Sequence, residues 1–255
     1  PTKISIMDGF RLYDVNPANW QELQQFVGSI LSECGFVTEI EKSIETVRGK
    51  ISVDIYGERK ESFESKIICE CKNWETPIPQ TVIHAFRTVI NDSGADHGYI
   101  ISKVGFQKGA YAAIEKSNVS IISWEEFHEK FKKEWLTQII ERNYKIGRKL
   151  MQLSFDVTSA IHKKLISFDE TQMNEFYAQK ESDFHFYTFK EHYLNLDNYE
   201  ISDQQVNSSI DSFERKHSMG FSSYRHFFNT IMEECNNIIV EWKSILSNSN
   251  ALTKE

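Results

Sequence analysis

The 255-residue chain is predicted to be an α/β protein: a mixed sheet flanked by helices, followed by a mainly α-helical region. Short apolar runs bounded by turn residues predict buried strands, and after residue 65 they alternate with helical patterns. Between residues 132 and 166 glycine occurs only at 147, proline is absent, and apolar residues recur at helical spacing. We therefore predict a first domain over residues 1–134 and a mainly helical region over residues 135–255.

The bounds of the helices and strands in the first domain are predicted from the capping and turn residues at their ends. The first helix is expected to enter at Asn16-Pro17 and to end at Gly35, in the usual position after a helix. Strands are expected over 36–40, 51–56, 67–72, 99–102 and 119–122, with a turn over 44–49 and a charged loop over 57–65. Helices are expected over 80–91 and 110–116. Ser123 and Glu126 have the spacing of a capping box, which predicts another helix from Trp124.

The second region is expected to contain one or two long helices over 132–166 and a terminal helix over 224–246. Ser202 is expected to cap a helix that runs through Phe213. The aromatic run 184–189 is interpreted as a strand or as an apolar helix face. Aromatics are enriched at interfaces, so we expect this region to mediate self-association or to bind a partner protein.

Three charged residues interrupt two apolar runs. Asp54 lies in the first run, and Glu70 and Lys72 lie in the second. Alternate residues of a strand share a face, so Glu70 and Lys72 project together, and Asp54 joins them if the two runs are neighbouring strands. Two carboxylates can hold a hard divalent cation, and an ammonium beside them can act in phosphodiester hydrolysis. The alternative is a solvated salt bridge on an exposed strand, but buried charges are costly unless they are paired or metal-bound.

The order of these motifs resembles the Mrr-like restriction endonuclease domain of the PD-(D/E)xK nucleases, over residues 16–127. The resemblance rests on Gly35-Phe36 after a helix, Asp54 in a strand, Glu70-Cys71-Lys72 in the next, and the later segments 98–103 and 105–110. It implies a restriction-endonuclease-like fold with Asp54, Glu70 and Lys72 as catalytic residues. Mg²⁺, or Mn²⁺, would be held by Asp54, Glu70 and the backbone carbonyl of Cys71.

The family often carries an acid in its first helix, and the corresponding position here is Gln24. A neutral amide is a poorer ligand for Mg²⁺ than a carboxylate. Glu22 is two residues away and is expected to point to another face of the helix. We therefore expect Gln24 to contribute little to metal binding.

The resemblance implies a metal-dependent DNA endonuclease, a hydrolase, in a restriction or antiviral defence system. Two alternatives stay open: a catalytically silent nuclease fold used as a binding module, and a nuclease directed at RNA or at DNA junctions. Phosphate contacts are expected from a polar helix stripe and from two lysines near a helix start, and the alternative for each is a solvated surface. These residues are Gln80, His84, Arg87, Lys103 and Lys108.

Overall charge constrains how DNA could be bound. The net charge is −8, and residues 1–130 hold 14 Lys and Arg against 19 Asp and Glu. DNA contact must therefore come from a local patch, a defence-system partner or a homo-oligomer, because phosphate binding needs cations. The apolar runs are too short to span a membrane, and the four cysteines are expected to be reduced, so we predict a cytoplasmic protein.

Overall fold

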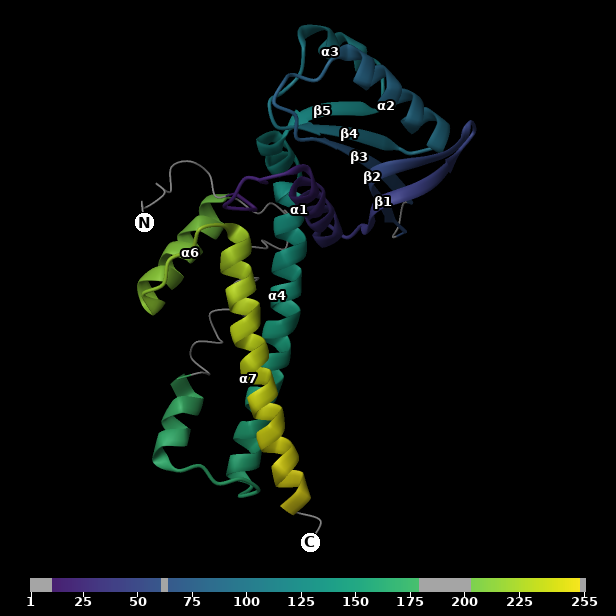
Figure 1. Ribbon diagram of the computed structural model, residues 1–255. Coiled ribbons are helices and arrows are strands. Elements are labelled where there is room, and N and C mark those ends of the chain that lie inside the picture. The colour runs from purple at the N-terminus through teal and green to yellow at the C-terminus, as the bar shows by residue number, and fades with distance from the viewer. Residues whose placement is uncertain (1–10, 61–63, 179–202, 253–255) are drawn as a thin grey trace. The chain divides into compact units, whose positions relative to one another are not determined.

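The computed structural model describes residues 11–60, 64–178 and 203–252 (Figure 1). The chain divides into two compact units, Val15–Gln138 and a second unit made of Pro1–Asp14 with Ile139–Glu255. The predicted aromatic run 184–189 and the predicted cap Ser202 lie outside the described residues. The functional division into residues 1–134 and 135–255 stays a prediction.

Helix α1 spans Trp20–Glu33 and begins later than the sequence suggested. Asn19 caps it, since its side-chain oxygen accepts the backbone N–H of Glu22 at 2.9 Å. The expected entry at Asn16-Pro17 is therefore wrong. Asparagine satisfies an otherwise unpaired N–H of the first turn, and Asn19, rather than Asn16, is the residue that does so here.

The end of α1 was predicted correctly. Gly35 has a φ of +92°, a conformation that costs glycine little. The N–H of Phe36 donates to the carbonyl of Leu31 at 3.1 Å, and the N–H of Gly35 donates to the carbonyl of Ser32 at 3.0 Å. This pair of bonds is a Schellman motif, which ends the helix and turns the chain into the first strand.

Five strands form one sheet in the order β1-β2-β3-β4-β5. Strands β1 to β3 are antiparallel, whereas β3, β4 and β5 are parallel, so the predicted mixed sheet is confirmed. The strand bounds are β1 Val37–Thr46, β2 Gly49–Arg59, β3 Ser65–Lys72, β4 His97–Ser102 and β5 Val119–Ser123.

Two loops that the sequence suggested are shorter in the structure, because strand pairing includes part of each. The predicted turn over 44–49 contains the last pairs of the β1–β2 ladder, from Ile44 with Ile51 to Thr46 with Gly49. The start of the predicted loop over 57–65 pairs with β3, from Gly57 with Ile67 to Arg59 with Ser65. Both segments are rich in polar residues, yet the ladder satisfies their backbone groups as well as water would.

Helices α2 (Gln80–Ser93) and α3 (Lys108–Ala113) lie on the same side of the sheet (Figure 1). The core beneath them contains fully or almost fully buried residues from the sheet and from α2, namely Ile68, Ile100, Ile121, Ile83, Phe86 and Ile90. The predicted α2 is confirmed. Helix α3 begins two residues earlier than predicted and ends three residues earlier, because Ile114 caps it and Lys116 has a left-handed φ of +55°.

Helix α4 spans Trp124–His162, so the predicted capping-box helix and the predicted long helix are one element. Ser123 and Glu126 form the expected capping box. The Ser123 N–H donates to Glu126 Oε2 at 2.7 Å, and the Glu126 N–H donates to Ser123 Oγ at 3.1 Å. Two further helices, α6 (Asp203–His217) and α7 (Tyr224–Leu252), and a helical segment over 170–178 complete the described residues.

Aromatic side chains fill the interior of the second unit. The ring of Phe227 packs against Phe213, Phe221 and Phe228, with centroid distances of 5.7, 5.1 and 5.1 Å. Trp242 is 1% exposed and packs against Phe176. The described aromatics that suggested an interaction surface thus serve as core. Among the described residues, none of the helices combines the length and the apolar character that a membrane span needs.

Candidate active site

The register of the β2–β3 pair brings the two predicted carboxylates together. Ile55 pairs with Cys69, so the next residues along the two antiparallel strands are Asp54 and Glu70. Side chains at opposite positions of an antiparallel pair lie on the same face of the sheet. The prediction that the two apolar runs are neighbouring strands is confirmed.

Asp54 is tied to the next strand by its own side chain. Its Oδ2 accepts the backbone N–H of Cys71 at 2.7 Å, two residues beyond Cys69, where the β2–β3 pairs end. In an antiparallel ladder the N–H and C=O of one residue point toward the same neighbouring strand. The carbonyl of Cys71 therefore faces the same side as Asp54.

Glu70 and Lys72 form an ion pair between Oε1 and Nζ. Their side chains are 23% and 19% exposed, so water reaches both without fully solvating them. The pair leaves the second carboxylate oxygen of Glu70 and one oxygen of Asp54 outside these two hydrogen bonds. The ammonium of Lys72 thus pairs with Glu70, and Asp54 lies opposite Glu70 in the β2–β3 register.

The electrostatics of this group favour a cation. Burial raises the pKa of Glu70, the negative charge of Asp54 raises it further, and Lys72 offsets part of the rise. The donors are carboxylate and carbonyl oxygens, which suit Mg²⁺ or Mn²⁺. Among the residues that the structure describes, no group of three or more His, Cys, Asp and Glu side chains could hold a metal. Metal binding by Asp54, Glu70 and the Cys71 carbonyl therefore stays a prediction.

Comparison with known proteins identifies the fold that carries this site. Residues 15–131 match the family model Mrr_cat, described as a restriction endonuclease. This segment is a restriction endonuclease domain of the Mrr type. The match includes the whole sheet, helices α1 to α3 and the start of α4. No curated protein matches the chain.

Three solved structures are similar to the chain at low identity. A protein of unknown function, AF1548, is 12% identical, with a TM-score of 0.39, and the match covers 90% of this chain and all of that one. The DNA modification-dependent restriction endonuclease AspBHI is 12% identical, with a TM-score of 0.32, over 46% of this chain and 30% of its own. A repair endonuclease from Pyrococcus abyssi is 18% identical, with a TM-score of 0.31, and the match covers 44% of this chain and 48% of that one. The family match carries the assignment.

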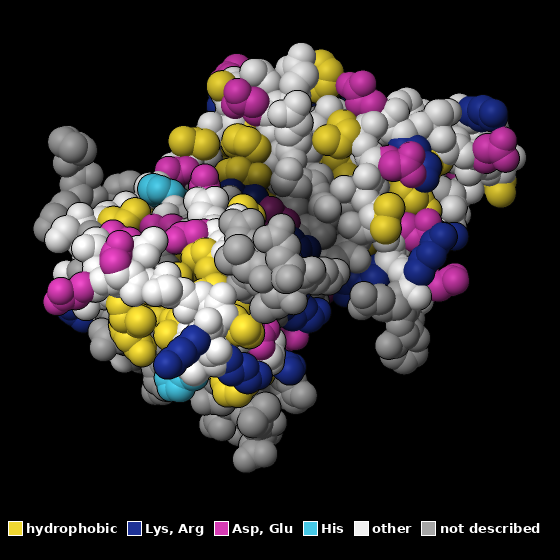
Figure 2. Space-filling view, turned by 90° about the horizontal axis from the view of Figure 1, so that it is seen from below, with side chains coloured by type: hydrophobic (Ala, Val, Ile, Leu, Met, Phe, Trp, Pro, Cys, Tyr) yellow, Lys and Arg dark blue, Asp and Glu magenta, His cyan; other side chains and the backbone are white. Residues whose placement is uncertain are grey.

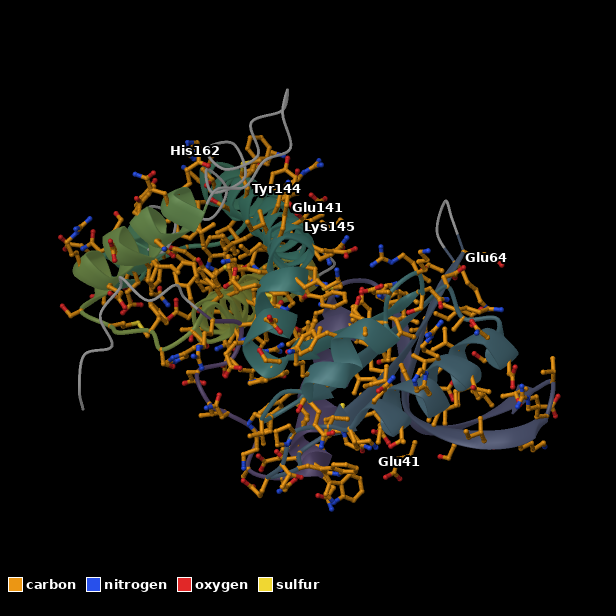
Figure 3. All side chains as sticks on the ribbon, turned by 90° about the horizontal axis from the view of Figure 1, so that it is seen from above. Glu41, Glu64, Glu141, Tyr144, Lys145 and His162 are labelled. Carbon is orange, nitrogen blue, oxygen red and sulfur yellow. The ribbon has the colours of Figure 1, made fainter. Side chains whose placement is uncertain are left out.

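Three other acid and amide side chains of the domain were considered as additional ligands, and the structure gives each of them different surroundings. Glu41 stands across from Asp54 in the β1–β2 register, but it has a left-handed φ of +53°, and its side chain points away from the sheet (Figure 3). Glu22 accepts the N–H of Ala18 at 2.8 Å and so stabilises the start of α1. Gln24 is 3% exposed and lies on the buried side of α1.

The five residues expected to contact phosphate have different surroundings. Gln80 and His84 lie one turn apart on α2, and their Nε2 atoms are 3.0 Å apart. Arg87 donates to the carbonyl of Ala113 at 2.6 Å and so links α2 to α3. Lys103 pairs with Glu75 at 2.6 Å, and Lys108 is exposed at the start of α3. Contact between these residues and DNA stays a prediction.

One residue beside the site was not singled out from the sequence. Trp74 is 42% exposed, and Lys72 Nζ lies 5.8 Å from the centroid of its ring. Its position two residues after Lys72, at the end of a predicted strand, is the sequence signal that could have placed Trp74 near the site.

Proposed function

We propose that the chain is a metal-dependent DNA endonuclease that hydrolyses phosphodiester bonds through Asp54, Glu70 and Lys72. The observation that carries the proposal is the β2–β3 register, which gathers two carboxylates and an ammonium on one face inside a restriction endonuclease domain. The proposal assigns this chemistry to the domain over residues 1–134, and it assigns a partner or oligomerisation role to residues 135–255.

Each residue has a separate role in the proposed reaction. Asp54, Glu70 and the Cys71 carbonyl would hold Mg²⁺ or Mn²⁺, and the metal would make a water molecule more acidic and polarise the phosphate. Lys72 orients the attacking water or stabilises the negative charge that develops on the phosphate oxygens. The ion pair with Glu70 keeps the ammonium of Lys72 in position before the substrate binds.

The substrate side of the proposal is DNA, cut in a restriction or antiviral defence system. Gln80, His84 and Lys108 are proposed phosphate contacts, and Arg87 and Lys103 are proposed to join them by exchanging their present partners for phosphate. Figure 2 shows cationic and acidic side chains interspersed on the face drawn, and the net charge is −8. A second copy or a defence-system partner would then supply further cations. The four cysteines are buried and form no disulfide, which supports a reducing, cytoplasmic location.

The test is cleavage of supercoiled, linear and single-stranded DNA with Mg²⁺, with Mn²⁺ and with EDTA. Lys72→Met and Glu70→Gln should each lower the cleavage rate by at least about 100-fold, since removal of one group that stabilises the transition state commonly has this effect. Lys60→Met is the matched control, because Lys60 is also a lysine paired with an acid, Glu58, but it comes directly after the last residue of β2, Arg59. Its rate should equal that of the unmodified chain.

Parallel arms with structured RNA and with a four-way DNA junction separate the competing substrates. Cutting of RNA or of the junction alone would replace duplex DNA as the proposed substrate. Absence of cutting in every arm with either metal would overturn the nuclease proposal and favour a silent binding module.

A further inference from the structure

Trp74 differs from most tryptophans of this chain. Trp124, Trp135 and Trp242 are 4%, 1% and 1% exposed and belong to the core, whereas Trp74 is 42% exposed. An indole is a large apolar group, and it contributes to folding only when it is removed from water. More than half of the Trp74 side chain is buried, and the rest is open to solvent beside Lys72.

The loop that carries Trp74 is fixed by hydrogen bonds before and after it. The N–H of Lys103 donates to the carbonyl of Lys72 at 3.2 Å. The N–H of Ile78 donates to the carbonyl of Gly105 at 3.0 Å, and the carbonyl of Ile78 accepts the N–H of Gln107 at 3.0 Å.

A buried side chain holds the same loop, and an ion pair adds to it in the protein without DNA. The side chain of Ile78 is fully buried in the core of the domain. Glu75, the residue after Trp74, is paired with Lys103 at 2.6 Å. The exposed indole is thus presented on an anchored loop beside the candidate catalytic lysine.

We propose that Trp74 is a stacking surface for an unpaired nucleobase next to the scissile phosphate. This inference rests on the proposed nuclease function and narrows its substrate. Every nucleobase has a flat π face, and an exposed indole is a good partner for it. In a duplex the faces of a base are covered by its neighbours, so an aromatic side chain can reach them only where the base is unpaired or unstacked.

The geometry connects stacking with the reaction. Lys72 would contact the phosphate, and its Nζ lies 5.8 Å from the ring of Trp74, a separation that one nucleotide can bridge through its sugar. The nuclease should therefore favour DNA that contains a flap, a bubble or a single-stranded end at the cut position.

Kinetics of two variants test the proposal on a DNA bubble and on the same sequence fully paired. On the bubble, Trp74→Ala should lower kcat/KM by about 5- to 150-fold, the equivalent of the 1–3 kcal/mol that stacking of one base contributes. Trp74→Phe keeps an aromatic face and should lose much less. Trp20→Ala is the matched control, since Trp20 is 45% exposed, and it should match the unmodified chain.

A binding measurement without divalent metal separates this inference from the nuclease proposal. In the Trp20→Phe protein, an oligo(dT) should quench indole fluorescence, and the quenching should disappear when Trp74 is also changed to Phe. Equal kcat/KM for Trp74→Ala and the unmodified chain on the bubble, or quenching that persists without Trp74, would overturn the stacking role. If the unmodified chain cuts nothing, the nuclease proposal fails, while the quenching still decides whether Trp74 stacks on a base.

Discussion

Asp54 has two separable functions, and two substitutions should distinguish them. Its Oδ2 accepts the Cys71 N–H at 2.7 Å, and its charge raises the pKa of Glu70. Asp54→Asn keeps an oxygen that can accept the same N–H but removes the charge. Asp54→Ala removes both, and it leaves a half-buried backbone donor without its present acceptor.

The expected change in the free energy of unfolding follows from the hydrogen bond between Asp54 and the Cys71 N–H. Leaving a buried donor unsatisfied costs about 1–3 kcal/mol, so Asp54→Ala should lower the free energy of unfolding by about that amount. Asp54→Asn should lower it by less than about 0.5 kcal/mol, because a neutral acceptor replaces a charged one while one carboxylate repulsion disappears. Both variants should lose at least about 100-fold in cleavage rate, since both lose the carboxylate that is proposed to bind the metal.

Urea unfolding in EDTA at pH 7.5 measures the stability difference, and cleavage of supercoiled DNA with Mg²⁺ measures activity. Addition of Mg²⁺ should also raise the Tm of the unmodified chain but not that of Asp54→Asn. Equal stability of the alanine variant and the unmodified chain would refute the structural role of the hydrogen bond. Full activity of Asp54→Asn would refute the role of the carboxylate in metal binding.

Three further substitutions probe the surroundings of the site. Gly98→Ala should destabilise the domain by about 1–3 kcal/mol in urea unfolding, because its new Cβ would lie 2.6 Å from Cγ1 of Ile90 in α2; unchanged stability would contradict this packing. Glu70→Gln in EDTA should raise Tm at pH 8, because burial and the charge of Asp54 raise the pKa of Glu70, so its ionised form is costly in the folded state. That gain should shrink as pH falls through the raised pKa and vanish below the unfolded-state pKa of about 4.3; a gain that grows on acidification would reverse the assigned direction. Gln24→Ala should reduce cleavage far less than Glu70→Ala, and equal losses in folded variants would show that α1 supplies a metal ligand.

The elements that sequence predicted well depend on neighbours in the chain. Gly35 ends α1 because glycine adopts the left-handed conformation at low cost, and Ser123 begins α4 through a residue three positions away. The approach of Asp54 to Glu70 could also be predicted, since strand alternation and a short connection leave few alternative registers.

The features that sequence missed depend on residues far away in the chain. A helical stripe indicated the face on which Arg87 lies, but not that the Ala113 carbonyl would accept its hydrogen bond. The charge of Lys103 suggested phosphate, but Glu75 on another loop pairs with it in the structure. The exposure of Trp74 likewise depends on how its loop is anchored, which no local pattern encodes.

The burial of all four cysteines has a consequence for labelling experiments. Cys34, Cys69 and Cys71 lie in the nuclease unit and Cys235 lies in the other unit, and each is at most 5% exposed. Burial also raises the pKa of Cys69 and Cys71, so few of these thiols are ionised and reactive at neutral pH. The native chain should therefore react slowly with thiol reagents, and a single cysteine introduced on the surface would carry a dye almost alone. The rate at which each native thiol reacts would then measure how often its unit opens. Cys69 would report on one unit and Cys235 on the other.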